Sequence, residues 1–168
     1  MSKNFVAVML GSDSDLKVMQ STLDTLDSLG VHWELRILSA HRTPDEVRQY
    51  LEDSDARGCA VYIAAAGLAA HLAGAVAAHT LKPVIGVPLD AGSLGGMDAL
   101  LATVQMPGGV PVACVAIGSA GAKNAAFLAA RILALSDENT AAALVNYRDT
   151  NRASVLAKNE NLPQAGGS

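Results

Sequence analysis

Five apolar runs of strand length divide the chain, and each is followed by a segment with helical periodicity. The runs are Phe5 to Leu10, Trp33 to Leu38, Cys59 to Ala66, Pro83 to Leu89 and Val110 to Ile117. Strands that are apolar along their whole length are typical of a parallel sheet covered by helices on both faces. The pattern therefore predicts an α/β fold with three layers.

The segments between these runs predict the covering helices. They span residues 16–29, where Gly30 ends the helix, then 44–54, 69–79, 97–105 and 122–135, and a last helix spans 137–158. We expect a flavodoxin-like arrangement with strand order 2-1-3-4-5 and an added C-terminal helix. In this order the loops after the first three strands lie side by side at the carboxyl edge of the sheet, where they open a crevice. A single domain, residues 1–158, and a disordered tail, residues 159–168, are expected.

Charge and cysteine content argue against a nucleic-acid-binding protein and against a disulfide or metal-binding cysteine pair. The formal charge is −4, and the 12 Lys and Arg residues are scattered without a run, which argues against a nucleic-acid surface. Cys59 and Cys114 both lie in apolar, strand-like runs, so buried free thiols are expected rather than a disulfide or a metal pair. Free thiols fit a reducing cytoplasm.

A stretch without formal charge, residues 59–81, is long enough to raise the question of a transmembrane helix. It is interrupted by Gly67, His71 and Gly74, and its residue pattern changes halfway along the stretch. This favours a buried strand followed by a buried helix, and no membrane segment is expected. The N-terminal residues also lack the pattern of a signal peptide.

The loop after the second strand, Ser39 to Pro44, combines a hydroxyl, an imidazole and a guanidinium within four residues. Thr43, Pro44 and Glu46 together match a capping box at a helix start. Arg42 offers a rigid fork of donors that suits phosphate or carboxylate, while His41 can exchange a proton near neutral pH. Such a loop can hold an anion and move a proton, although a capped turn with a surface histidine would also explain it.

The loop after the first strand, Gly11 to Asp15, has the sequence GSDSD. It lies at a helix start, where free backbone N–H groups and the helix dipole favour an anion. It matches neither the P-loop nor the dinucleotide-binding pattern. One of its polar residues is expected to cap the helix, and Asp15 suits sugar hydroxyls better than phosphate because like charges repel. An alternative is that Asp13 and Asp15 hold magnesium, for which Asp90 is the nearest further carboxylate.

The third loop and its helix, Ala66 to His79, are almost free of polar residues. His71 is the exception, and a histidine in such a setting is either a satisfied core residue or a catalyst. A helix that is apolar on nearly every face is normally covered on all sides, and one sheet covers only one side. We therefore expect a compact homo-oligomer. Because no histidines, cysteines or carboxylates have metal-ligand spacing, no metal is expected.

Five motifs, in matching order and spacing over residues 5–158, closely resemble those of the PurE family of purine biosynthesis. They are GSDSD at 11–15, SAHRTP at 39–44, the loop at 67–74, VQMPGGVP at 104–111 and AIG at 116–118. The resemblance implies a class I member, a 5-(carboxyamino)imidazole ribonucleotide mutase of IMP biosynthesis. Such an enzyme moves a carboxyl group from the exocyclic nitrogen to ring carbon C4 without metal, cofactor or ATP.

The resemblance also implies roles for individual residues. His41 would be the general acid and base, and His71 would help to enclose the migrating carboxyl group together with Gly67 and Leu72. Binding of the 5-phosphate would fall to Ser12, Ser39 and Arg42, and binding of the ribose to Asp15. Arg42 favours the mutase, because the branch that carboxylates aminoimidazole ribonucleotide directly with CO2 typically has lysine there.

The third loop departs from the commonest family version at Ala65, Leu68 and Ala73, which leaves the shape of the carboxyl pocket open. The resemblance further implies an octamer in the cytoplasm, with CO2 as a trapped intermediate. Direct contact with the upstream ATP-dependent carboxylase is left open. Two other classes remain as alternatives: a flavin-binding electron carrier, although none of the three loops holds an aromatic ring for stacking, and a non-catalytic phosphosugar-binding protein.

Overall fold

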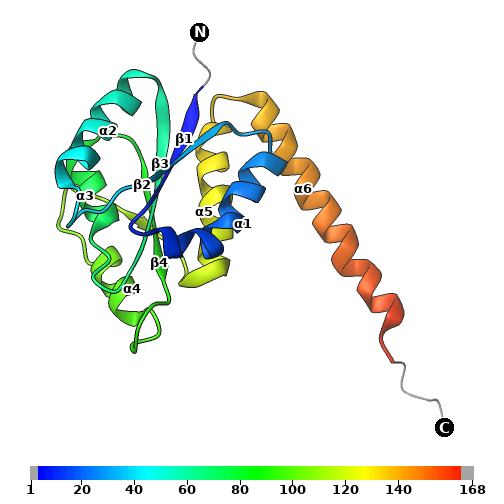
Figure 1. The fold of residues 1–168 in the computed structure, drawn as a ribbon. Coiled ribbons are helices and arrows are strands. Elements are labelled where there is room, and N and C mark those ends of the chain that lie inside the picture. Colours follow the sequence, from blue (N-terminus) through cyan, green and yellow to red (C-terminus); the bar gives the residue numbers. More distant parts are fainter. Residues whose placement is uncertain (1–3, 164–168) are drawn as a thin grey trace.

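The computed structural model describes residues 4–163 and contains a five-stranded, all-parallel sheet in the order β2-β1-β3-β4-β5 (Figure 1). The strands are β1 (Phe5–Leu10), β2 (Trp33–Ile37), β3 (Cys59–Gly67), β4 (Val84–Leu89) and β5 (Ala113–Cys114). The helices are α1 (Leu16–Ser28), α2 (Pro44–Ala56), α3 (Leu72–His79), α4 (Met97–Val104), α5 (Gly118–Leu133) and α6 (Glu138–Ala157). The predicted fold class and strand order are confirmed.

Helices cover both faces of the sheet because alternate side chains of each strand point to opposite faces. In β1, Val6, Val8 and Leu10 pack in the same apolar cluster as α1 and α5. Phe5, Ala7 and Met9 pack on the other face with α2 and α3. Figure 1 shows these two layers, with α4 on the same side as α2 and α3.

The C-terminal helix α6 packs on α5 near its start and then runs away from the body of the domain (Figure 1). Between these two helices, the ring centroids of Phe127 and Tyr147 lie 4.5 Å apart. A 3-10 helix, Lys158–Asn161, follows α6. The tail that we expected at 159–168 lies partly outside the described residues, since these end at Pro163.

Three predicted boundaries are wrong. The edge strand β5 has two residues rather than eight. Pro111 has no N–H to donate to the sheet, which disfavours an earlier start, and the pairing with β4 covers only Ile85 and Gly86. Helix α3 starts at Leu72, after tight turns in which Ala70 N–H bonds to the Leu68 carbonyl and His71 N–H to that of Ala69. Helix α5 starts at Gly118 rather than residue 122, so Gly121 lies inside it.

Both cysteines are free. Cys59 is buried, as predicted, and burial raises the pKa of its thiol to about 11, while Cys114 is only half-buried. Over the part of the chain that the structure describes, no helix has both the length and the apolar character needed to cross a membrane. Residues 59–81 form β3 and α3 instead.

Candidate functional site

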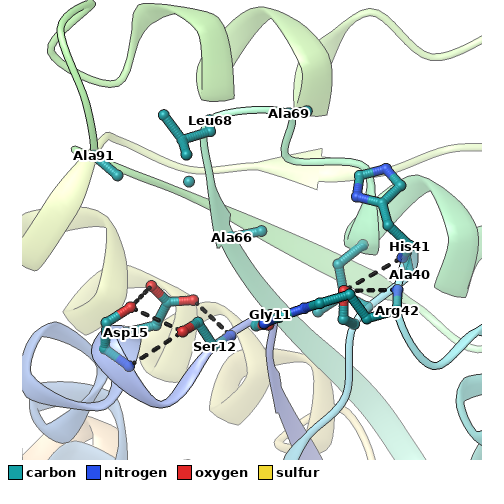
Figure 2. A pocket seen from close by; sticks show the side chains of 14 residues that line it. Gly11, Ser12, Asp15, Ala40, His41, Arg42, Ala66, Leu68, Ala69 and Ala91 are labelled. Carbon is teal, nitrogen blue, oxygen red and sulfur yellow. Dashed lines mark hydrogen bonds between the residues drawn. The ribbon is translucent and has the colours of Figure 1, made fainter.

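A pocket of about 420 Å³ opens at the carboxyl edge of the sheet, where the loops after β1, β2 and β3 meet (Figure 2). Its volume is within the range of small-molecule sites. Seven of the eight residues with predicted roles line it: Ser12, Asp15, Ser39, His41, Arg42, Gly67 and Leu72. The eighth, His71, is bonded to His41. The three loops therefore come together as the strand order predicts, whereas the roles of their residues stay predictions.

Two hydrogen bonds connect the three loops across the top of the sheet. The Arg42 guanidinium donates from Nη2 to the Gly11 carbonyl at 2.8 Å, which joins the first and second loops. The His41 and His71 rings share a hydrogen bond of 2.8 Å between Nε2 and Nδ1, which joins the second and third. Both histidines are exposed, so His71 is not the satisfied core residue that its apolar neighbours in sequence suggested.

The second loop is closed by a reciprocal pair of bonds between its ends. Ser39 N–H donates to the Thr43 hydroxyl at 2.9 Å, and that hydroxyl donates to the Ser39 carbonyl at 3.1 Å. The predicted capping box at Thr43 is therefore wrong, because its hydroxyl closes the loop and makes no cap bond to α2. The Ser39 hydroxyl in turn accepts from His41 N–H and Arg42 N–H, which fixes the backbone that carries both side chains.

The first loop contains a capping box at a short 3-10 helix, Asp13–Asp15. The Ser12 hydroxyl accepts from Ser14 N–H, and the Asp15 carboxylate accepts from Ser12 N–H at 3.1 Å. Ser12 is thus the capping residue among the candidates. Over residues 4–163, no cluster of three or more His, Cys, Asp or Glu side chains is arranged to hold a metal ion.

Burial raises the pKa of the Asp15 carboxyl above its ordinary value. Hydrogen bonds from Ser12 and Ser14 and the nearby Arg42 charge act in the opposite direction and are too weak to cancel this effect. Since the folded chain binds this proton more readily than the unfolded chain, ionised Asp15 destabilises the fold at neutral pH. A carboxylate that lines a pocket and destabilises the fold is typical of a functional position.

Asp15→Asn should therefore unfold at the same temperature as the wild type or a higher one at pH 7 to 8. The amide oxygen can still accept from Ser12 N–H, and the penalty for a partly buried charge is removed. The gain should shrink as the pH falls through the raised pKa of Asp15, and it should vanish near pH 4, its ordinary value. Thermal unfolding at several pH values measures this. Asp24→Asn, at an exposed position on α1, is the control, and a gain independent of pH would contradict the assignment.

The fourth side of the pocket comes from the loop after β4, residues 90–96, where no substrate-binding residue was predicted. Ala91 lines the pocket, and a Cβ built on Gly67 would lie 2.7 Å from the Cβ of Ala91. The third and fourth loops are thus in close contact. The sequence does indicate this contact, because β4 neighbours β3 in the predicted strand order and a glycine-rich segment follows β4.

Leu68 has an unusual backbone conformation beside this contact. Its φ of 55° is the only positive φ of a residue other than glycine within residues 4–163. A left-handed conformation costs an L-residue with a side chain roughly 1–2 kcal/mol relative to glycine. Leu68 also lines the pocket and is 53% exposed.

Comparison with known proteins identifies the family. The family model described as AIR carboxylase matches residues 5–154. The chain belongs to the PurE (AIR carboxylase) family. It is 50% identical to the N5-carboxyaminoimidazole ribonucleotide mutase of Bacillus subtilis (strain 168), over 94% of this chain and 97% of that protein. It is 49% identical to the mutase of the same name from Brucella melitensis, over 93% and 96%.

The fold of this PurE-family chain also matches a solved structure of the family. The crystal structure of Treponema denticola PurE superposes with a TM-score of 0.87 and 30% identity, over 96% of this chain and 100% of that one. Two of the family motifs, 104–111 and 116–118, lie outside the pocket. In the first of them Met106 packs beneath α3, since a Cβ built on Gly74 would lie 3.2 Å from its sulfur.

Proposed function

We propose that the chain is a 5-(carboxyamino)imidazole ribonucleotide mutase that forms 4-carboxy-5-aminoimidazole ribonucleotide in purine biosynthesis. The observation that carries the proposal is that His41, hydrogen-bonded to His71, lines one pocket with Arg42, in a chain that matches named mutases over nearly its whole length. The test is conversion of the carboxyamino ribonucleotide by the purified protein without ATP.

The ribonucleotide is oriented by the uneven distribution of polar groups around the pocket. Ser12, Ser39 and Arg42 place hydroxyls and a guanidinium on the side formed by the first two loops, and these bind the 5-phosphate. Asp15, on the same side, accepts hydrogen bonds from the ribose hydroxyls. The apolar side, formed by the third and fourth loops, then faces the imidazole and its carboxyl group.

The pair of histidines can hold and move one proton. A single proton lies between His41 Nε2 and His71 Nδ1, so that one ring donates and the other accepts. Protonating both rings fully would place two N–H donors against each other. The bonded pair therefore carries at most one positive charge, which His41 can give up to substrate and regain in one cycle.

The carboxyl transfer proceeds in two steps that together conserve every atom. In the first, the N–C bond of the carbamate breaks, its electron pair stays on nitrogen, and nitrogen takes a proton from His41. Neutral aminoimidazole ribonucleotide and CO2 result. In the second, the π electrons at C4 form a bond to CO2, and neutral His41 takes the proton that C4 loses. No oxidant, metal or nucleotide triphosphate is consumed.

Arg42→Ala is expected to weaken substrate binding by about 1.5–3 kcal/mol, the usual strength of a hydrogen bond to a charged group. The Michaelis constant should rise roughly 10- to 150-fold, with a smaller effect on kcat. Steady-state kinetics measure both. Arg42→Lys should recover part of the lost binding, because lysine keeps the positive charge but lacks the paired N–H donors of the guanidinium. Arg48→Ala, at an exposed position on α2, should change neither constant. An unchanged Michaelis constant for Arg42→Ala would place the phosphate elsewhere.

The same proposal includes a homo-octamer in the cytoplasm. Large apolar side chains are exposed between α3 and β4, on and before α4, and on α6, namely Leu81, Leu94, Met97, Leu101, Val104, Val145, Val155 and Leu156. Helix α6 also extends beyond the domain (Figure 1). Surfaces of this kind are typically covered by further subunits. Sedimentation at several protein concentrations measures the assembly, and a monomer at all of them would contradict it.

A further inference from the structure

The side chain of Leu68 joins the third and fourth loops at the apolar side of the pocket. Its Cδ2 lies so close to Gly92 that a Cβ built on that glycine would be 2.6 Å away. Gly92 itself has a φ of 75°, so neither residue has a relaxed L-type backbone. Non-glycine residues keep a left-handed conformation only where their surroundings hold them, and such positions are concentrated at functional sites.

Figure 2 shows Leu68 and Ala91 on one side of the pocket, with Ser12 and Asp15 on the other. The apolar side is formed by Ala66, Gly67, Leu68, Ala69, Leu72 and Ala91. Among these, Leu68 and Leu72 are the only large side chains. Leu72 is buried in the domain, whereas Leu68 is half-exposed at the rim of the pocket. Leu68 is therefore the large, solvent-exposed side chain of this side of the pocket.

We propose that Leu68 is a positioning residue that closes the apolar side of the pocket and retains CO2 between the two steps of carboxyl transfer. This inference rests on the proposed mutase function. Between the steps CO2 carries no charge that Arg42 could hold, so it stays only if the pocket excludes water and blocks its exit. Leu68 acts by covering the space beside C4, and it makes no bond to any reacting atom.

Retention of CO2 can be measured with a substrate whose transferable carboxyl group carries 13C. The reaction is run with excess unlabelled bicarbonate and carbonic anhydrase, and the 13C content of the carboxylated product is read by mass spectrometry. Label is kept when the original CO2 reacts, and lost when it escapes and is replaced. In a parallel reaction without bicarbonate, escape appears as aminoimidazole ribonucleotide accumulating beside the product.

Four variants distinguish the effect of the Leu68 side chain from the effect of its strained backbone. Leu68→Ala removes the cover but keeps a Cβ at positive φ, Leu68→Gly removes both the cover and the strain, and Leu68→Met restores an apolar cover of similar length. Leu135→Ala, just after α5, removes another exposed leucine, which does not line the pocket. Because glycine adopts this φ freely, Leu68→Gly should unfold at the wild-type temperature or above it. Its activity is then that of a folded protein.

We expect the wild type, Leu68→Met and Leu135→Ala to keep most of the label, with a several-fold larger loss in Leu68→Ala and Leu68→Gly. The Michaelis constant should stay near the wild-type value in all four variants, because the phosphate side is untouched. Wild-type retention in both Leu68→Ala and Leu68→Gly would overturn the inference while leaving the mutase function standing. Complete label exchange in the wild type would also overturn it. Failure of the wild type to convert the substrate at all would instead refute the proposed function.

Discussion

His41→Asn is expected to lower kcat by about 10²- to 10⁴-fold, the usual contribution of a general acid and base. Asparagine can still hydrogen-bond to His71, but it cannot release and regain a proton. The polar side of the pocket, with Ser12 and Arg42, is unchanged, so the Michaelis constant should stay close to that of the wild type. Steady-state turnover of the carboxyamino ribonucleotide, together with direct titration of its binding, measures both quantities.

His79→Asn is the matched control for this experiment. His79 is also exposed, but it lies at the far end of α3 and does not line the pocket. Its replacement should leave turnover and binding unchanged. Near-normal turnover by His41→Asn would refute the role of His41, and loss of binding together with turnover would assign His41 to substrate binding instead.

Gly121→Ala is expected to destabilise the fold by at least about 3 kcal/mol, at the upper end of the usual cost of overpacking. A Cβ on this buried residue of α5 would lie 1.6 Å from the Ala116 carbonyl oxygen and 2.6 Å from its carbonyl carbon. Backbone atoms cannot rotate away as a side chain can, so α5 would have to shift from the sheet. This cost exceeds the 0.5–1 kcal/mol that alanine normally gains over glycine inside a helix.

Urea unfolding at one fixed protein concentration measures the change, because assembly makes apparent stability depend on concentration. Gly108→Ala is the control, since a Cβ there would have no atom within 4 Å. It should change the free energy of unfolding by less than about 0.5 kcal/mol. Equal stability of Gly121→Ala and the wild type would show that α5 does not approach the Ala116 carbonyl as described.

The arrangement of the sheet could be predicted because it follows from simple patterns. Apolar runs without alternation indicated the buried parallel strands β1, β3 and β4, whereas β2, which contains Glu34 and Arg36, is a half-exposed edge strand. The predicted order placed the loops at Gly11, Ser39 and Gly67 at one edge. The contact between His41 and His71 is a consequence of that order. Their strands, β2 and β3, lie on either side of β1, so the two loops meet across the end of β1.

Local hydrogen bonds were harder to predict because one side chain can satisfy competing partners. Thr43 matches a capping box in sequence, yet its hydroxyl bonds to Ser39 and closes the loop. The start of α5 was predicted at residue 122 instead of Gly118, because sequence alone does not reveal how closely Gly121 lets the helix approach the Ala116 carbonyl. The positive φ of Leu68 was not predicted either, since leucine rarely adopts it without support from neighbours such as the Gly92 loop.

The position of Ala91 shows how a prediction of the site can be incomplete rather than wrong. The three loops with polar residues were predicted to form the site because hydroxyls, carboxylates and histidines suggest chemistry. The fourth loop adds only small apolar groups, and its contribution is shape and the exclusion of water. A wall of this kind has no residues that suggest chemistry, so only the strand order can predict it. It becomes visible once the neighbouring strand ends are placed together.

The central claim is tested most directly by supplying the two candidate substrates separately to the purified protein. One reaction contains 5-(carboxyamino)imidazole ribonucleotide alone, and the other contains aminoimidazole ribonucleotide with bicarbonate and carbonic anhydrase. Formation of the 4-carboxy product is followed in both, without ATP. We expect rapid formation from the carboxyamino ribonucleotide and far slower formation from aminoimidazole ribonucleotide. Product formed only from aminoimidazole ribonucleotide and CO2 would contradict the mutase assignment.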